Sequence, residues 1–206
     1  MKKTEKIYCF DFDGTIANTL PLIVKTVNDI LKKQNEEEVS DEMLRKIRRE
    51  GIEEVLKEDV GIPFYKLVFL YLTIRRDMNK EMSSFTITGE MKDTLKKLHR
   101  EGHTLGIITS NSKKNVNSFL ENNDIDIFKF INASGLFGKK RVIKKLKKKG
   151  GIFIYVGDEP RDIIAGRRAG VKTVAVLWGL SSRRALVKAR PDIIIEKPYD
   201  LLNLSF

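Results

Sequence analysis

Short apolar runs alternate with longer amphipathic segments along most of this 206-residue chain. Six runs rich in β-branched and aromatic residues are predicted to be strands, at residues 6–10, 104–109, 128–132, 152–156, 172–177 and 192–194. Apolar residues at helical spacing predict helices at residues 89–101, 113–122, 139–149, 160–169 and 181–189. Strands that alternate with helices form parallel sheets covered on both faces. The pattern therefore predicts an α/β fold with a doubly wound parallel sheet.

The region from residue 16 to residue 85 departs from this alternation, because it contains no convincing β run. Helical periodicity runs instead through residues 20–33, 40–50, 51–58 and 63–79. Ser40, followed by acidic residues, is a typical N-cap of the second of these helices. We therefore expect two domains: a core formed by residues 1–15 and 86–206, and an inserted all-helical cap domain formed by residues 16–85.

The sequence excludes two classes of protein: those with a membrane-spanning helix and those stabilised by disulfides. No apolar stretch approaches the roughly 18 residues needed to cross a bilayer. The N-terminus is basic, as in a signal peptide, but the apolar run at residues 7–10 is short and ends at Asp11. The single cysteine, Cys9, excludes an intramolecular disulfide and a multi-cysteine zinc site. We expect a cytoplasmic protein with no membrane partner.

The net charge of +11 raises the question of a nucleic-acid partner. Eight of the eleven residues at 139–149 are basic, yet Val142, Ile143 and Leu146 lie among them at helical spacing. The segment is therefore typical of a helix with one buried stripe and a solvated cationic face. Because no aromatic residue is interleaved with these lysines for base stacking, we expect no nucleic-acid partner. The positive field is expected to attract small anions.

Two carboxylates one residue apart, Asp11 and Asp13, directly follow the first predicted strand. Ligands of open α/β sheets bind beyond the carboxyl ends of the strands. Two acids crowded there repel each other and are costly to desolvate unless a cation or a proton compensates, so the pair predicts a metal site with perturbed titration. Oxygen-only ligands favour Mg²⁺. Gly14 allows backbone N–H groups to approach an anion closely.

Three further strand ends carry polar residues. Asp158 follows the fourth predicted strand, and Asp162 comes four residues later, where an acid also commonly stabilises a helix N-terminus. Ser110 and Asn111 follow the second strand and are equally typical of helix caps. Lys139 opens the basic helix. Their recurrence at the same end of successive strands favours a shared site over separate caps.

These residues, taken in order, resemble the four motifs of the haloacid dehalogenase superfamily, and the resemblance covers nearly the whole chain. The matching segments are Asp11-Phe12-Asp13-Gly14-Thr15, Thr109-Ser110-Asn111, Lys139, and Gly157-Asp158 with Asp162. The helical insertion resembles the small α-helical cap of phosphoglycolate phosphatase-like members. The third motif departs from the pattern, because many relatives have a proline after the lysine. Here Lys139 is followed by Lys140, which remains an alternative.

The resemblance implies a Mg²⁺-dependent phosphatase that hydrolyses small phosphomonoesters through an aspartyl-phosphate intermediate. Asp11 is implied as the nucleophile, and Asp13 as the general acid and then the general base. The implied metal ligands are Asp11, the main-chain carbonyl of Asp13, and Asp158, with Asp162 ordering a metal-bound water. The implied phosphate-binding residues are Gly14, Ser110, Asn111 and Lys139. A small phosphorylated metabolite is the expected substrate.

Two alternatives to a phosphatase stay open. One is a phosphomutase, which shares all four motifs. A dehalogenase, by contrast, would not need the second carboxylate, and Asp13 is present. A nucleic-acid-binding or regulatory module without turnover predicts steeply salt-dependent binding and no phosphatase activity. The cap is expected to select the substrate, and there Arg48 and Arg49 are candidates to meet a second anionic group. The oligomeric state does not follow from these residues.

Overall fold

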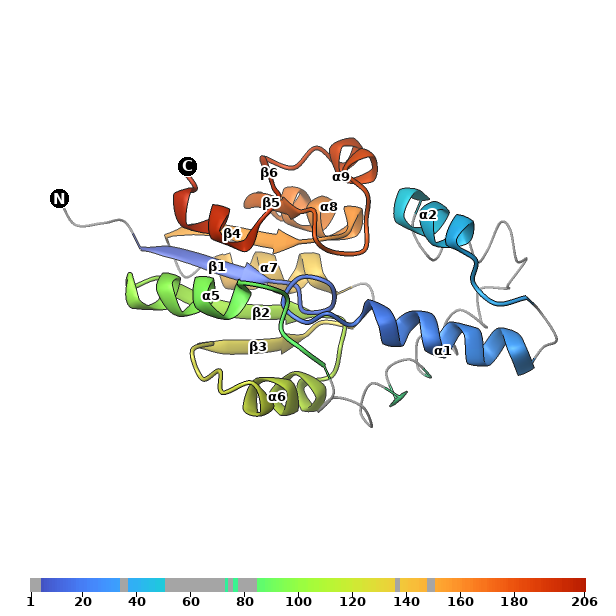
Figure 1. Ribbon diagram of the computed structural model, residues 1–206. Coiled ribbons are helices and arrows are strands. Elements are labelled where there is room, and N and C mark those ends of the chain that lie inside the picture. Colours follow the sequence, from blue (N-terminus) through green and yellow to red (C-terminus); the bar gives the residue numbers. More distant parts are fainter. Residues whose placement is uncertain are drawn as a thin grey trace.

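Six strands form one parallel sheet in the computed structural model, which describes residues 5–33, 37–50, 73, 76–77, 85–135, 138–147 and 151–206. The strands are β1 (Lys6–Phe10), β2 (Thr104–Thr109), β3 (Phe130–Ala133), β4 (Ile152–Gly157), β5 (Lys172–Val176) and β6 (Ile193–Ile195). Their order is β3-β2-β1-β4-β5-β6, and each neighbouring pair is parallel (Figure 1). The predicted doubly wound sheet is confirmed.

Helices cover both faces of the sheet (Figure 1). One face carries α5 (Met91–Arg100), α6 (Lys113–Asn122) and the 3₁₀ helix η2 (Pro198–Asn203). The other carries α7 (Lys139–Lys147), α8 (Pro160–Ala169) and α9 (Arg183–Ala189). Side chains of β1 alternate between the two layers, because successive strand residues point to opposite faces. Tyr8 and Phe10 pack beneath α5 and α6, whereas Ile7 and Cys9 pack beneath α7 and α8.

Some element boundaries differ by one or two residues from those that the periodicity predicted. Strand β3 begins at Phe130 rather than at residue 128, and α9 begins at Arg183 rather than at residue 181. The second shift has a local cause, because the hydroxyl of Ser182 accepts from the N–H of Ala185 at 3.3 Å. Ser182 is therefore the N-cap, outside the helix.

The insertion begins with helices α1 (Leu20–Lys33) and α2 (Asp41–Glu50), both predicted from the sequence. Ser40 caps α2 as expected, because its hydroxyl accepts from the N–H of Met43 at 3.1 Å. The helices predicted at residues 51–58 and 63–79 lie outside the described residues, except for Thr73, Arg76 and Asp77, which are helical. The division into a core and a cap domain stays a prediction.

The chain leaves and re-enters the core along two paired segments. The N–H of Asn18 donates to the carbonyl oxygen of Thr86 at 3.1 Å, and the N–H of Thr88 donates to that of Ile16 at 2.9 Å. These bonds flank an antiparallel bridge between Ala17 and Ile87. Residues 16–18 follow the carboxyl end of β1 and hold residues 86–88 beside them, so the insertion lies beyond that end of the sheet (Figure 1).

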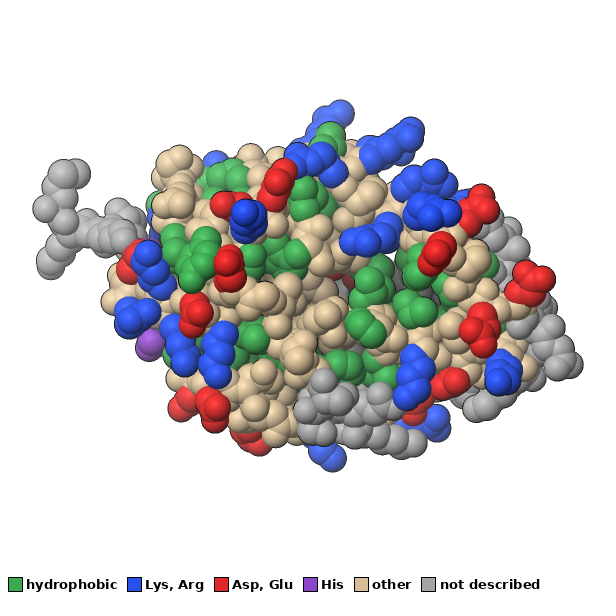
Figure 2. All heavy atoms as spheres, viewed as in Figure 1, with side chains coloured by type: hydrophobic (Ala, Val, Ile, Leu, Met, Phe, Trp, Pro, Cys, Tyr) green, Lys and Arg blue, Asp and Glu red, His purple; other side chains and the backbone are tan. Residues whose placement is uncertain are grey.

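Basic side chains gather over α2 and α9 on the face shown in Figure 2. The exposed members on these helices are Arg45, Arg48, Arg49, Arg183, Arg184 and Lys188. The positive charge is thus not confined to the lysine-rich helix α7. Among the residues that the structure describes, no helix has both the length and the apolarity needed to cross a membrane.

Candidate active site

The sheet reverses its strand order between β1 and β4, and the acidic residues follow these two strands. From β1 the chain builds outward through β2 to β3, and then returns to the other side of β1 through β4, β5 and β6. Asp11 follows β1, and its N–H donates to the carbonyl oxygen of Val156 at 2.8 Å. Asp158 follows β4. The two carboxylates therefore lie at the switch point, where α/β sheets bind their ligands.

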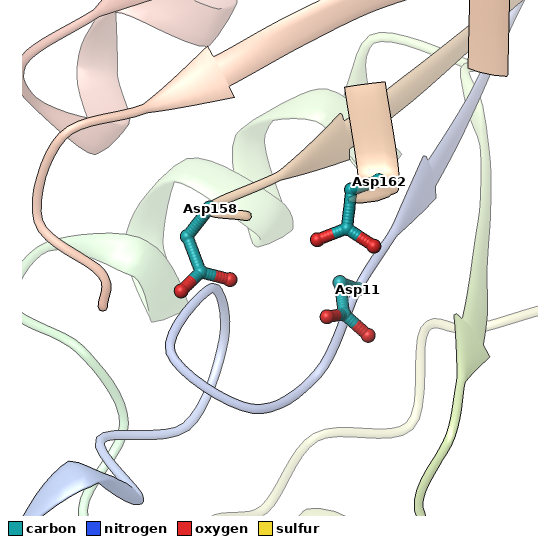
Figure 3. A group of neighbouring side chains, drawn as sticks. All are labelled: Asp11, Asp158 and Asp162. Atoms are coloured by element: carbon teal, nitrogen blue, oxygen red, sulfur yellow. The ribbon is translucent and has the colours of Figure 1, made fainter. Parts of the chain in front are cut away.

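Three carboxylates converge there, from Asp11, Asp158 and Asp162 (Figure 3). One oxygen from each lies within 4.8 Å of the others, and the residues are 2%, 1% and 0% exposed. Asp162 reaches the group from the first turn of α8. Its carboxylate also accepts from the N–H of Glu159 at 3.2 Å, so it both caps the helix and faces the site. Buried charges of one sign require a compensating cation.

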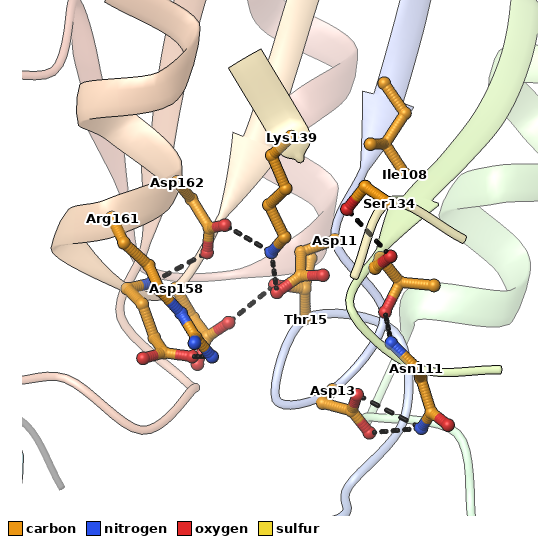
Figure 4. A network of polar contacts seen from close by, with 12 residues as sticks. Asp11, Asp13, Thr15, Ile108, Asn111, Ser134, Lys139, Asp158, Arg161 and Asp162 are labelled. Carbon is orange, nitrogen blue, oxygen red and sulfur yellow. Dashed lines mark hydrogen bonds and ion pairs between the residues drawn. The ribbon is translucent and has the colours of Figure 1, made fainter. Parts of the chain in front are cut away.

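Lys139 supplies part of that compensation (Figure 4). Its Nζ lies 2.8 Å from Oδ2 of Asp11 and 2.5 Å from Oδ1 of Asp162, and the residue is 5% exposed. Burial alone lowers the pKa of an ammonium, but the carboxylates of Asp11 and Asp162 outweigh this and raise the pKa of Lys139. The lysine is therefore fully charged at neutral pH.

The neighbouring Lys140 is exposed and does not enter the cluster. The position of the buried lysine follows from helical geometry. Lys139 precedes the buried Ile143 by four residues and Leu146 by seven, so all three share one face of α7. The structure therefore brings Lys139 to the site, and this spacing was the sequence signal that separates it from Lys140.

Asp11 is held in an unusual electrostatic environment. Burial, followed by the nearby charge of Asp162, raises the pKa of Asp11 from 3.8 to about 7, although Lys139 opposes the shift. Its Oδ1 is buried and has no hydrogen-bond partner among the described residues. A buried carboxylate oxygen without a donor is costly, so the site fits a cation. Together with the cluster's oxygen-only donors, this oxygen fits a hard ion such as Mg²⁺.

Asp158 is fixed by donors on both of its oxygens. The hydroxyl of Thr15 donates to Oδ1 at 2.9 Å, and the N–H of Leu180 donates to Oδ2 at 2.8 Å. Two glycines make room for this carboxylate. A Cβ on Gly14, whose φ is +74°, would lie 2.4 Å from Oδ2, and a Cβ on Gly179 would lie 2.2 Å from the Cβ of Asp158. Burial raises the pKa of Asp158 well above its ordinary value.

Asp13 lies at the edge of the cluster and is half-buried. The side-chain amide of Asn111 donates to both of its carboxylate oxygens, at 3.1 and 3.2 Å (Figure 4). Burial raises the pKa of Asp13 to about 6, against the lowering effect of the bond from Asn111 and the charge of Lys139. A carboxyl group with this pKa can hold and release a proton near neutral pH.

The predicted phosphate-binding residues are brought to this edge of the sheet, with some groups already engaged. Ser110 and Asn111 follow β2 and are 8% and 3% exposed. The N–H of Asn111 donates to Oγ1 of Thr109 at 2.9 Å, and the N–H of Gly14 donates to the carbonyl oxygen of Ala17 at 2.9 Å. The N–H of Gly14 is thus engaged within its own loop, and the phosphate-binding role of Gly14 stays a prediction.

Two further residues, Thr15 and Trp178, support the cluster. Thr15 lies within the first motif, so its position was a signal that its hydroxyl faces the site. Trp178 directly follows the fifth predicted strand, so the sequence placed it at the same edge of the sheet, as part of the site wall or as a packing residue. It belongs to the β5–α9 loop (residues 177–182), and its indole N–H donates to the carbonyl oxygen of Thr15 at 3.0 Å. This contact joins segments 163 residues apart in the chain, which only folding brings together.

Residues 8–176 match the family model of the haloacid dehalogenase-like hydrolases. The chain belongs to this family. The resemblance of the four motifs to haloacid dehalogenase proteins is thus confirmed. The matched range starts inside β1 and ends with β5, so it contains Asp11, Lys139 and Asp158.

Curated relatives of this haloacid dehalogenase-like chain include two kinds of phosphatase. It is 29% identical over 200 residues to a phosphoglycolate phosphatase of Synechococcus elongatus, covering 94% of each chain. It is 28% identical over 208 residues to the pyrophosphatase PpaX of Anoxybacillus flavithermus, covering 95% of this chain and 94% of that one. The prediction of a phosphatase-like enzyme is confirmed at this level.

A solved structure shows the same fold. A haloacid dehalogenase-like hydrolase from Streptococcus pneumoniae superimposes with a TM-score of 0.78 at 19% identity, over 98% of this chain and 99% of that one. The α/β architecture predicted from the alternating runs is therefore that of the family.

Proposed function

We propose that this haloacid dehalogenase-like chain is a Mg²⁺-dependent phosphatase that hydrolyses small phosphomonoesters through an aspartyl-phosphate on Asp11. The observation that carries the proposal is the environment of Asp11. Its carboxylate is buried beside Lys139, has one unengaged oxygen, and lies two residues before a second carboxyl group whose pKa is about 6. This arrangement suits a nucleophile with an adjacent proton carrier.

The residues that would hold Mg²⁺ are Asp11, Asp158 and the main-chain carbonyl of Asp13, with Asp162 reaching the ion through water. The three clustered carboxylates, one lysine and a donor-free oxygen support this set. When bound, the ion would offset the repulsion between Asp11 and the substrate phosphate and would polarise the phosphoryl oxygens. Lys139 would neutralise further phosphoryl charge, and the hydroxyl of Ser110 would donate to a phosphoryl oxygen.

In the first step a carboxylate oxygen of Asp11 forms a bond to phosphorus, and the bond between phosphorus and the ester oxygen breaks. Asp13 gives its proton to the departing alcohol oxygen. In the second step water attacks the same phosphorus and gives a proton to Asp13, while the bond between Asp11 and phosphorus breaks and phosphate leaves. Asn111 would orient Asp13 for both transfers, because its amide already donates to both carboxylate oxygens.

The insertion at residues 16–85 is proposed to be a cap domain that selects the substrate. Its support is the position of α1 and α2 beyond the carboxyl end of the sheet, and the paired segments that join it to the core (Figure 1). Since one relative is a phosphoglycolate phosphatase and another a pyrophosphatase, 2-phosphoglycolate and pyrophosphate are the first substrates to compare.

The test is phosphate release from 2-phosphoglycolate, pyrophosphate and p-nitrophenyl phosphate, with Mg²⁺ and with chelator. We expect Mg²⁺-dependent turnover that Asp11→Asn abolishes and that Asp126→Asn, at an exposed position, leaves unchanged. Asp13→Asn should release one equivalent of nitrophenolate in a burst and then turn over slowly, because this leaving group needs no proton whereas the attacking water needs a base.

Two outcomes would overturn the proposal. Turnover that survives in Asp11→Asn would remove Asp11 as the nucleophile. Phosphate release from none of the three compounds would favour the alternatives: dependence on a bisphosphate activator would indicate a phosphomutase, and salt-dependent binding of DNA or RNA would indicate a binding module.

A further inference from the structure

Helix α2 of the insertion contacts the β5–α9 loop through polar and apolar groups. Nη2 of Arg48 donates to the carbonyl oxygen of Gly179 at 3.0 Å, and the carbonyl oxygen of Arg48 accepts from the N–H of Ser182 at 2.6 Å. Ile47 and Leu180, which are 4% and 9% exposed, pack together in one small apolar cluster. The last turn of α2 thus holds three residues of this loop.

The other side of the β5–α9 loop faces Asp158. The N–H of Leu180 donates to one carboxylate oxygen of Asp158, and Gly179 packs so closely on its Cβ that no side chain fits between them. Trp178 donates to the carbonyl oxygen of Thr15, whose hydroxyl donates to the second carboxylate oxygen. The loop therefore lies between α2 and the carboxylate, with bonds to both.

We propose that Arg48 is a positioning residue: by holding the β5–α9 loop against Asp158, it makes the affinity of the site for a divalent metal ion depend on the docking of α2. The inference rests on the proposed function in one respect, the assignment of Asp158 as a metal ligand. Hydrogen-bond partners orient a metal ligand, and losing one weakens metal binding. Because linkage is reciprocal, bound metal would in turn favour the docked position of α2.

If Arg48 acted only through its charge, removing it would strengthen metal binding, whereas loss of its contact with the β5–α9 loop should weaken metal binding. Arg48 is one of several exposed cations on α2 and α9 (Figure 2). Removing a positive charge near a cation site strengthens cation binding through Coulomb's law, whichever neighbouring arginine is changed. The sign of the change therefore separates a contact that orients Asp158 from a general effect of charge.

The experiment compares the wild-type protein with Arg48→Met, Arg48→Lys and the matched control Arg49→Met. Mg²⁺ or Mn²⁺ binding is measured by calorimetry without substrate, and hydrogen exchange is followed at the amides of Leu180 and Ser182. Arg48→Met should raise the metal Kd about tenfold, the low end of the effect of such partners, and should speed exchange at both amides. Arg49→Met should leave both unchanged or tighten metal binding.

The lysine variant should recover part of the affinity, because an ammonium can still donate to the carbonyl oxygen of Gly179. If Arg48→Met does not fold, Ile47→Val weakens the same docking more gently and should give a smaller rise in Kd. A metal Kd for Arg48→Met that equals or falls below that of Arg49→Met overturns the inference, as does a wild-type protein that binds no metal.

A change confined to KM also overturns it. If Arg48→Met raises only the KM for carboxylate-bearing esters and leaves metal binding intact, Arg48 contacts the substrate instead. Calorimetry and hydrogen exchange are both carried out without substrate, so the role of Arg48 is tested independently of phosphatase activity. Weaker metal binding and faster amide exchange in Arg48→Met, with no phosphatase activity in any form of the protein, would refute the proposed function and leave the role of Arg48 standing.

Discussion

Replacing Lys139 by methionine should destabilise the metal-free protein far more than replacing its neighbour Lys140. The methionine keeps most of the length and apolar volume of the side chain but removes the ammonium. Two buried carboxylates then lose the ammonium that contacts both, since Nζ of Lys139 lies 2.8 Å from Asp11 and 2.5 Å from Asp162. Lys140 is exposed, so Lys140→Met removes the same formal charge from the same turn of α7.

The magnitude follows from these two contacts. At an effective dielectric constant of about 20, each is worth roughly 6 kcal/mol of Coulomb attraction, much of which the desolvation of the ammonium offsets. Removing one partner of a buried ion pair costs about 3–5 kcal/mol net. For a chain of this size that corresponds to a fall in Tm of roughly 6–20 °C. Lys140→Met should stay within about 0.5 kcal/mol of the wild-type protein.

Urea unfolding in chelator, followed by circular dichroism and by the fluorescence of the single tryptophan, measures the difference. Trp178 reports on the site itself, because its indole donates to Thr15. At pH 5 the difference in stability between the two variants should narrow, because Asp11, with a pKa of about 7, is then protonated and one of the two carboxylate charges that Lys139 contacts is gone. Equal unfolding midpoints at pH 8, or a gap of the same size at both pH values, would refute the reasoning.

Two further predictions concern proton binding and the glycine beside Asp158. In chelator, lowering the pH from 8 to 5 should raise the Tm, because the raised pKa of Asp11 makes the folded state bind more protons than the unfolded state between pH 4 and 7. Mg²⁺ should restore the Tm at pH 8. Scanning fluorimetry measures these Tm values, and the control is Asp11→Asn, whose Tm should depend less on pH. Gly14→Ala and Gly102→Ala place a side chain at similar φ, +74° and +81°, which costs about 1–2 kcal/mol, but only the former collides with Asp158. Gly14→Ala should therefore unfold at lower urea and bind Mg²⁺ more weakly than Gly102→Ala, and equal behaviour of the two would contradict the described contact.

The local pattern of apolar residues in the sequence was sufficient to predict much of the fold. The continuous apolar run from Ile7 to Phe10 predicted a strand covered on both faces. The structure places Ile7 and Cys9 in one layer and Tyr8 and Phe10 in the other. Parallel strands share one carboxyl edge, so the sequence also predicted that residues following β1, β2 and β4 would meet. The burial of Asp11, Asn111 and Asp158 at one edge of the sheet agrees with this prediction.

What the sequence alone determined about this protein is therefore the strands of the sheet and the helices on its two faces, the family motifs and the end of the sheet that carries the site. Tertiary structure alone decided the contacts between distant segments: the bond from Trp178 to Thr15, the N–H of Leu180 on Asp158, and the docking of Arg48 on the β5–α9 loop. The physical reason is that periodicity and capping act over a few residues, whereas these bonds involve main-chain groups that every residue possesses. Their partners are set only when the sheet and the insertion pack together.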